Sequence, residues 1–193
     1  MGDRARRPGA RFGRSLTLAP SSHKGRGLLL AVLAILLLLL PAAAWAQTFP
    51  KFTNFVVDQA DIIPPKTEAQ LDRKLGELQR RTHHQLAIVT VSSLQGYDIN
   101  DYSIRLARNW GVGRRHYDDG VLLIVAPNEH RVRIEVGYGL EATLTDPRCA
   151  EIVRDLILPR FKADDMPGGI AAGADAIIAR LNSAAPLEKA KAS

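Results

Sequence analysis

Two neighbouring segments, residues 118–126 and residues 131–146, constrain the fold of this chain more than any other feature. The first, DDGVLLIVA, places an acidic pair and a glycine before six apolar residues, which is typical of a strand covered on both faces. After the turn residues PNEH, Val132, Ile134 and Val136 alternate with charged residues, which predicts a second strand with one polar face. The two segments together predict an antiparallel hairpin, followed by a glycine-lined exit and a helix.

This hairpin determines which residues meet. The start of its first strand lies beside the end of its second, so we expect Asp118 and Asp119 next to the glycine-flanked tyrosine, with Asp146 a few residues later. Carboxylate oxygens gathered around bare backbone suit a hard divalent cation. We therefore predict a Ca²⁺ or Mg²⁺ site here. The backbone expected to approach the ligand is that of Gly137, Tyr138 and Gly139.

Further acidic residues extend the predicted ligand set. The main candidates are Asp58, Asp118, Asp119 and Asp146, and the weaker candidates are Glu141, Asp164 and Asp165. Each aspartate also has a simpler interpretation, because aspartate favours turns and helix caps, and Glu141 could simply be solvated. Convergence favours the metal site, since several of these acids are expected at one end of one sheet, where their repulsion would need a cation or a proton to relieve it.

The remaining pattern predicts an α/β fold. Helical periodicity covers residues 66–81 and 98–110, and residues 85–91 form a strand rich in β-branched side chains. A helix is expected after Asp146, stopping near Pro159, and a last helix over residues 170–181. This order predicts a three-layer α/β/α sandwich whose mixed sheet combines a parallel crossover with the C-terminal antiparallel hairpin.

The amino-terminal residues are typical of a targeting segment. A basic leader precedes the uninterrupted apolar run 28–40, and Ala44-Trp45-Ala46 fits a signal-peptidase site. We expect residues 1–46 to be a cleaved signal peptide, residues 47–54 a linker, residues 55–182 the domain and residues 183–193 a disordered tail. The protein would then be periplasmic or secreted, without a membrane span after cleavage. A retained N-terminal membrane anchor is the alternative.

Charge and motifs exclude several classes of function. The leader holds seven of the 26 Lys and Arg residues and one of the 20 Asp and Glu residues, so 19 of each remain after Ala46. A near-neutral domain without a basic stripe gives no support for nucleic-acid binding. Cys149, the only cysteine, is expected to be a small buried hydrophobic residue. The chain also lacks a nucleophile elbow, a P-loop and a dinucleotide fingerprint.

The segments that combine with the hairpin resemble the TPM domain family. The resemblance runs from about residue 55 to residue 181 and includes VDQA at 57–60, NWGVG at 109–113, RIEVGYGLE at 133–141 and LTD at 144–146. It implies an α/β/α sandwich with an acidic cleft, calcium or magnesium binding in some bacterial members, and an acid phosphatase activity proposed for thylakoid members. Asp58, Asp118 and Asp146 match its acidic positions, whereas Asp119 stands where asparagine is more usual.

Two hypotheses of function follow, and a purely structural scaffold role is a third alternative. The first is a monomeric, divalent-cation-binding envelope module that acts through an envelope protein partner, since no activated nucleophile is evident. The second is a metal-assisted phosphomonoester hydrolase, in which the cation would polarise the phosphoryl oxygens and activate water. In the second hypothesis Arg115 or Arg133 would hold the phosphate.

Overall fold

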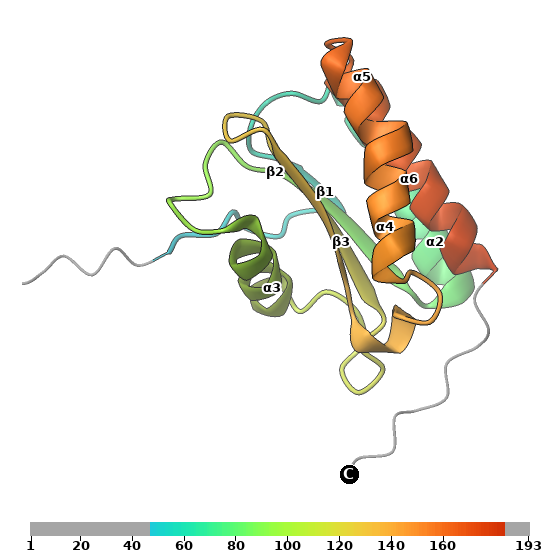
Figure 1. Ribbon diagram of the computed structural model, residues 1–193. Coiled ribbons are helices and arrows are strands. Elements are labelled where there is room, and N and C mark those ends of the chain that lie inside the picture. Colours follow the sequence, from blue (N-terminus) through green and yellow to red (C-terminus); the bar gives the residue numbers. More distant parts are fainter. Residues whose placement is uncertain (1–46, 184–193) are drawn as a thin grey trace, which may run out of the picture. The chain divides into compact units, whose positions relative to one another are not determined.

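A four-stranded mixed sheet forms the centre of the computed structural model, which describes residues 47–183 (Figure 1). Its strands β1 (Val56–Asp58), β2 (Gln85–Thr90), β3 (Gly120–Ala126) and β4 (Arg131–Val136) lie side by side in chain order. β1, β2 and β3 are parallel, and β4 is antiparallel to β3. The mixed sheet with its C-terminal hairpin is therefore confirmed, and β1 adds a short parallel edge strand to it.

Helices cover both faces of the sheet, which makes the domain a three-layer sandwich. α3 (Ile99–Trp110) lies on one face, and α2 (Pro65–Thr82) and α6 (Met166–Asn182) lie on the other (Figure 1). Side chains of β3 alternate between the two layers, so that Leu122 joins the core under α3 and Leu123 joins the core under α2 and α6. A strand buried on both sides explains why residues 121–126 are apolar at every position.

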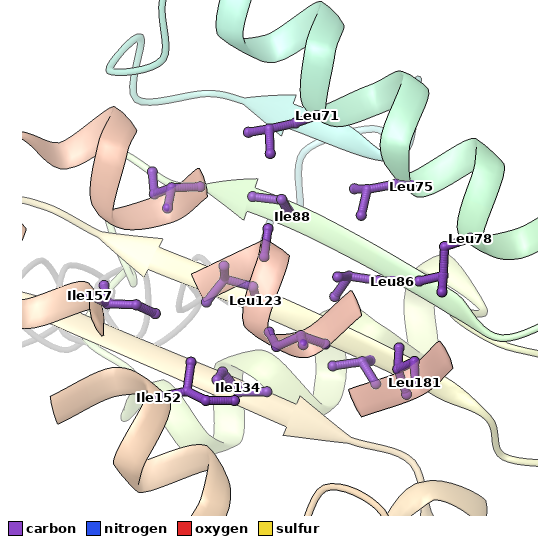
Figure 2. Close-up of a cluster of buried hydrophobic side chains, with 14 of the residues drawn as sticks. Leu71, Leu75, Leu78, Leu86, Ile88, Leu123, Ile134, Ile152, Ile157 and Leu181 are labelled. Atoms are coloured by element: carbon purple, nitrogen blue, oxygen red, sulfur yellow. The ribbon is translucent and has the colours of Figure 1, made fainter. Parts of the chain in front are cut away.

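The larger core lies between α2, α6 and the sheet. Leu71, Leu75 and Leu78 recur on one side of α2 and point toward Leu86 and Ile88 of β2 (Figure 2). All five side chains are almost completely buried. Burial of each is worth about 1.5–3 kcal/mol relative to exposure, so this interface holds α2 to the sheet.

Local sequence explains where α3 begins and ends. Asp98 caps its amino end, because its Oδ1 accepts a hydrogen bond of 2.8 Å from the Asn100 amide. Gly111 ends the helix in the left-handed conformation, with φ of 64°. The position of Gly111 matters for the site, because the chain turns there into the loop that precedes β3.

The helix that follows the hairpin does not stop near Pro159, contrary to the sequence-based expectation. α4 (Asp146–Glu151), the π-helix η2 (Ile152–Ile157) and α5 (Leu158–Lys162) follow one another without a break. Proline lacks the amide hydrogen of a regular helix and clashes with the carbonyl group four residues earlier. The wider π turns directly before Pro159 change this hydrogen-bond pattern, and the helical path continues past the proline.

Membrane crossing has no support in the described part of the chain, since none of the helices between residues 47 and 183 is both long and apolar enough to span a bilayer. The predicted signal peptide and its cleavage site up to Ala46 lie outside the described residues, as does almost all of the predicted disordered tail.

Candidate functional site

A pocket of about 650 Å³ opens where β3 begins and β4 ends, on the face of the sheet that carries α3. The loop between α3 and β3 forms one wall, and the 3₁₀ turn η1 (Tyr138–Leu140) and the start of α4 form another. Charged side chains of both signs line it: Arg108, Arg114, Arg115, Arg133, Asp118, Glu135, Glu141 and Asp146.

Three of the predicted acidic ligands share this pocket. Asp118, Glu141 and Asp146 all line it and are all exposed to solvent. None of the three forms an ion pair within the part of the chain that the structure describes. Asp118 comes from the loop before β3, Glu141 follows η1, and Asp146 is the first residue of α4. The hairpin therefore brings these residues to one pocket, as its antiparallel geometry predicts.

Asp119 is not available to a ligand in this structure. It is completely buried, and its carboxylate accepts hydrogen bonds from the backbone amide of Arg114 at 2.7 Å and from the Arg114 guanidinium, with Nη2 at 2.6 Å. The Nδ1 atom of His84 lies 3.4 Å from Oδ2. These contacts fix the loop between α3 and β3, so Asp119 serves as its internal anchor. His84 is buried as well.

The same loop is fixed to β2 and β3 by close backbone approach. The Gly113 amide donates to Gln85 Oε1 at 2.7 Å. A Cβ atom added to Gly113 would lie 2.4 Å from the backbone nitrogen of Gly120, too close for any side chain. The pocket wall that carries Arg114 and Arg115 is therefore positioned by rigid contacts with the sheet.

Gly137 and Gly139 allow two backbone segments to approach each other. A Cβ atom added at Gly137 would lie 2.1 Å from the carbonyl oxygen of Asp118, and one at Gly139 would lie 2.0 Å from that of Tyr117. The Gly139 amide donates to the Asp118 carbonyl at 3.0 Å. Neither glycine has a positive φ, so close approach of the backbone at residues 117–118, and not an unusual turn conformation, requires them. Tyr138 between them is 77% exposed.

Asp58 lies at the opposite edge of the sheet, so the expectation that it joins Asp118 is wrong. β1 ends at Asp58 beside Thr90, whereas β3 begins at Gly120 beside Gln85. Thr90 and Gln85 are five residues apart along β2, and at about 3.3 Å per residue the two ends of the strands are roughly 16 Å apart. The Asp58 carboxylate instead accepts hydrogen bonds from the amides of Ile62 and Ile63 and from the Thr90 hydroxyl.

Asp164 and Asp165 are also remote from the pocket. At about 1.5 Å per residue, the helical path from Asp146 to Lys162 is roughly 25 Å long, and both residues follow its far end. Asp165 caps α6 by accepting from the Gly168 amide at 2.9 Å, and Asp164 is exposed. The expectation that this loop folds back to the acidic cluster is therefore wrong.

Between residues 47 and 183 no group of three or more histidine, cysteine or acidic side chains is close enough to hold a metal ion. A cation in the pocket would therefore need ligands beyond the side chains as they lie. Metal binding by Asp118, Glu141 and Asp146 stays a prediction.

Cationic side chains are the main feature of the pocket that the sequence did not reveal. The sequence singles out Arg115 and Arg133 for holding a phosphate, but not Arg108 or Arg114. Arg133 Nε donates to Glu135 at 2.8 Å, and the Ser103 hydroxyl donates to the same carboxylate at 3.1 Å. Arg108 lies in the last turn of α3, which packs against the charged face of β4. The sequence could have placed Arg108 at this pocket if the packing of α3 on that face had been anticipated.

The fold and the pocket define a class of α/β/α sandwich domains with a charged pocket beside a glycine-rich hairpin exit. The TPM domain family model matches residues 56–180, and the chain belongs to this family. A comparison with curated proteins finds no match for this chain.

Solved structures of bacterial proteins agree with this assignment. The N-terminal domain of a P. gingivalis protein is 31% identical, with a TM-score of 0.63 over 67% of this chain and 83% of that domain. The N-terminal domain of cg2496 from Corynebacterium glutamicum is 16% identical, with a TM-score of 0.54 over 72% of this chain and 88% of that domain. BA42 from Bizionia argentinensis is 17% identical, with a TM-score of 0.56 over 66% of this chain and 86% of that protein. The last two likenesses concern the fold alone.

Proposed function

We propose that this protein is an exported module that binds a divalent cation, Ca²⁺ or Mg²⁺, in the pocket beside β3 and acts through a partner in the cell envelope. The observation that carries the proposal is that Asp118, Glu141 and Asp146 line one pocket as exposed carboxylates without ion-pair partners among the described residues. The proposed ligand set is thereby reduced to these three residues.

The openness of these ligands favours a role that depends on a partner. Ca²⁺ takes six to eight oxygen ligands and Mg²⁺ takes six in a stricter geometry. Three separated carboxylates leave most of these positions to water or to another molecule. A cation held in this way would keep exchangeable positions, to which carboxylate or phosphate oxygens of a partner could bind. The domain would then recognise its partner most strongly when the cation is present.

Titration of the chain that begins at Gln47 with Ca²⁺ and with Mg²⁺, followed by amide chemical shifts in NMR spectra, tests the proposal. We expect the largest shifts at the amides near Asp118, Glu141 and Asp146. The variant Asp118→Asn should weaken binding by at least about tenfold, because it removes one anionic ligand. The matched control is Asp164→Asn, which neutralises an exposed aspartate outside the pocket. Absence of localised shifts at millimolar cation would overturn the proposal.

Metal-assisted phosphomonoester hydrolysis is the second candidate, and one observation favours it. Arg108 and Arg115 line the same pocket as the three carboxylates and are exposed. Arginine binds phosphate oxygens through paired hydrogen bonds, while a cation on the acidic side could activate water. A phosphatase assay with and without the cation separates the two candidates. Binding without turnover favours the module, and turnover lost in Asp118→Asn and in Arg115→Ala favours the hydrolase.

A further inference from the structure

The segment 47–52, expected as part of a linker, is attached to the α3 side of the domain. The Thr48 amide donates to Gln95 Oε1 at 3.0 Å, and Gln95 Nε2 donates back to the Thr48 carbonyl at 2.5 Å. The Gln95 side chain thus satisfies both the amide and the carbonyl group of Thr48, as the backbone of a neighbouring strand would. We call residues 47–52 the N-terminal strap.

Aromatic contacts hold the rest of the strap. The ring of Phe49 packs edge-on against Tyr102, with ring centroids 5.3 Å apart. Trp110 Nε1 donates to the carbonyl of Pro50 at 2.8 Å, and the Trp110 ring lies 5.0 Å from that of Phe52. Tyr102 and Trp110 both belong to α3, so the strap follows this helix and covers the smaller of the two cores.

The strap, α3 and the β3–β4 turn each contribute a buried polar atom without a hydrogen-bond partner. Within the described residues, the buried side-chain atoms that have none are Gln47 Nε2, Tyr102 Oη and Glu129 Oε2. The other carboxylate oxygen of Glu129, Oε1, accepts a hydrogen bond from the Leu94 amide at 2.8 Å. Leu94 is followed by Gln95, whose side chain forms the hydrogen bonds with Thr48. An unpaired buried carboxylate oxygen is costly, since burial removes water without supplying a donor.

Glu129 also acts on Tyr102. Burial, and after it the negative charge of Glu129, raises the pKa of the Tyr102 hydroxyl. Glu129 and Tyr102 are thus close enough to influence each other, although they come from the β3–β4 turn and from α3. Printed contacts link the start of the strap to this turn: Thr48, the residue after Gln47, pairs with Gln95, and the residue before Gln95 is Leu94, whose amide donates to Glu129. We call this region the corner, and within the described residues the Glu129 carboxylate forms no ion pair there.

We propose that this corner is the binding site for the chain's own processed amino terminus, whose α-ammonium group pairs with the Glu129 carboxylate. Cleavage between Ala46 and Gln47 would convert the uncharged peptide nitrogen of Gln47 into an ammonium with three donors. Such a group can satisfy Glu129 Oε2 and match its charge, because hydrogen bonds between ionised groups are about twice as strong as those between neutral ones. The inference rests on cleavage after Ala46 and is independent of the chemistry of the pocket.

Pairing of the new α-ammonium group with Glu129 would make the stability of the domain depend on cleavage after Ala46. In the uncut chain the strap can still bind through Gln95 and the aromatic rings, but the Glu129 carboxylate has no cationic partner among the described residues. After the cut, the new terminus would hold the strap at its first residue. The processed domain would therefore be more stable than a chain that is only one residue longer.

Four chains test this proposal: those that begin at Gln47 and at Ala46, each with Glu129 and with Glu129→Gln. Glutamine keeps an acceptor for the Leu94 amide and removes the charge. Residues from Gln47 onward form a compact unit, so these chains can be compared by urea unfolding. At pH 6.5 an α-amino group is almost fully protonated, since its ordinary pKa is about 7.7–8.0. Intact mass must show that Gln47 has not cyclised with loss of ammonia.

We expect the chain that begins at Gln47 to have a folding equilibrium constant about tenfold higher than the chain that begins at Ala46, as a charge-assisted buried bond would give. In the Glu129→Gln background this difference should fall below about twofold. Equal stability of the two chains with Glu129 overturns the proposal. A difference that persists in Glu129→Gln also overturns it, because the extra residue would then act by its bulk.

Discussion

The guanidinium group of Arg114 covers the buried carboxylate of Asp119, with Nε and Nη2 at 2.7 and 2.6 Å from Oδ2. The same guanidinium stacks over the ring of Tyr117 at 3.9 Å from its centroid. Two residues of one short loop thereby neutralise each other and hold the wall of the pocket. Asp119 is a part of the scaffold, whereas its neighbour Asp118 faces solvent.

Removal of Arg114 should therefore destabilise the domain through Asp119. In Arg114→Ala the buried carboxylate keeps only the amide of residue 114 and His84 as partners. We expect a loss of about 2–4 kcal/mol in the free energy of unfolding, as for a buried pair that loses one partner. Urea unfolding measures it. The exposed neighbour provides the control, since Arg115→Ala should change stability by less than about 0.5 kcal/mol. A loss below about 1 kcal/mol in Arg114→Ala would show that the guanidinium does not hold this loop.

Asp58 should affect stability without affecting the pocket. Its carboxylate accepts from the amides of Ile62 at 3.2 Å and Ile63 at 2.7 Å, so Asp58→Ala leaves both amides without their acceptor. We expect a loss of about 1–3 kcal/mol in the free energy of unfolding, as for other buried groups that lose a partner. Cation-induced chemical shifts near Asp118 should keep their midpoint in the same variant. A weakened midpoint would show that the two edges of the sheet are coupled and would contradict separate roles for Asp58 and Asp118.

Cys149 should make the domain sensitive to alkaline pH. Burial raises the pKa of its thiol to about 11, from an ordinary value of 9.0, and the charge of Asp146 acts in the same direction. At a pH between these two pKa values, the thiol of the unfolded chain has lost its proton while the thiol of the folded chain keeps it. The free energy of unfolding therefore falls as pH rises from 9 to 11. We expect Cys149→Ala to show a smaller fall over this range, by on the order of 2 kcal/mol.

Thiol labelling provides an independent measurement for Cys149. Ellman's reagent at pH 8 should react with the folded protein far more slowly than with the urea-unfolded protein, because the neutral, buried thiol is a poor nucleophile. Equal labelling rates would show that the residue is accessible. The same result would also remove the basis for the predicted alkaline effect.

The sequence predicted the fold where local and long-range signals agree. The apolar run of β3 and the alternation of β4 specify a hairpin that local chemistry alone can form, and the helices before it follow the 3.6-residue period. It misplaced Asp58 because the run at residues 55–57 is too short to indicate pairing. Once β1 is known to be parallel to β3, a residue that ends one strand cannot meet a residue that begins the other.

The site was predictable only in part, for a related reason. The hairpin alone brings Asp118 near Gly137, Glu141 and Asp146, so these neighbours followed from the sequence. Burial of Asp119 depends on Arg114 folding back over it, and sequence spacing does not show which of two adjacent acids is enclosed. The strap was missed because its partners, Gln95 and Tyr102, lie more than 45 residues along the chain.

The order of the strands has a consequence for how the domain assembles as it leaves the ribosome. The buried core residues of the α3 side, which lie between Ala87 and Ala126, have all emerged by Ala126, and β4 then completes the face on which α3 packs. The opposite side stays uncovered until Ile177 and Leu181 arrive, because α6 completes its core beside α2. A chain that ends before α6 would leave the α2 face of the sheet with exposed apolar side chains. Such a chain would be prone to aggregation and would bind chaperones or be degraded.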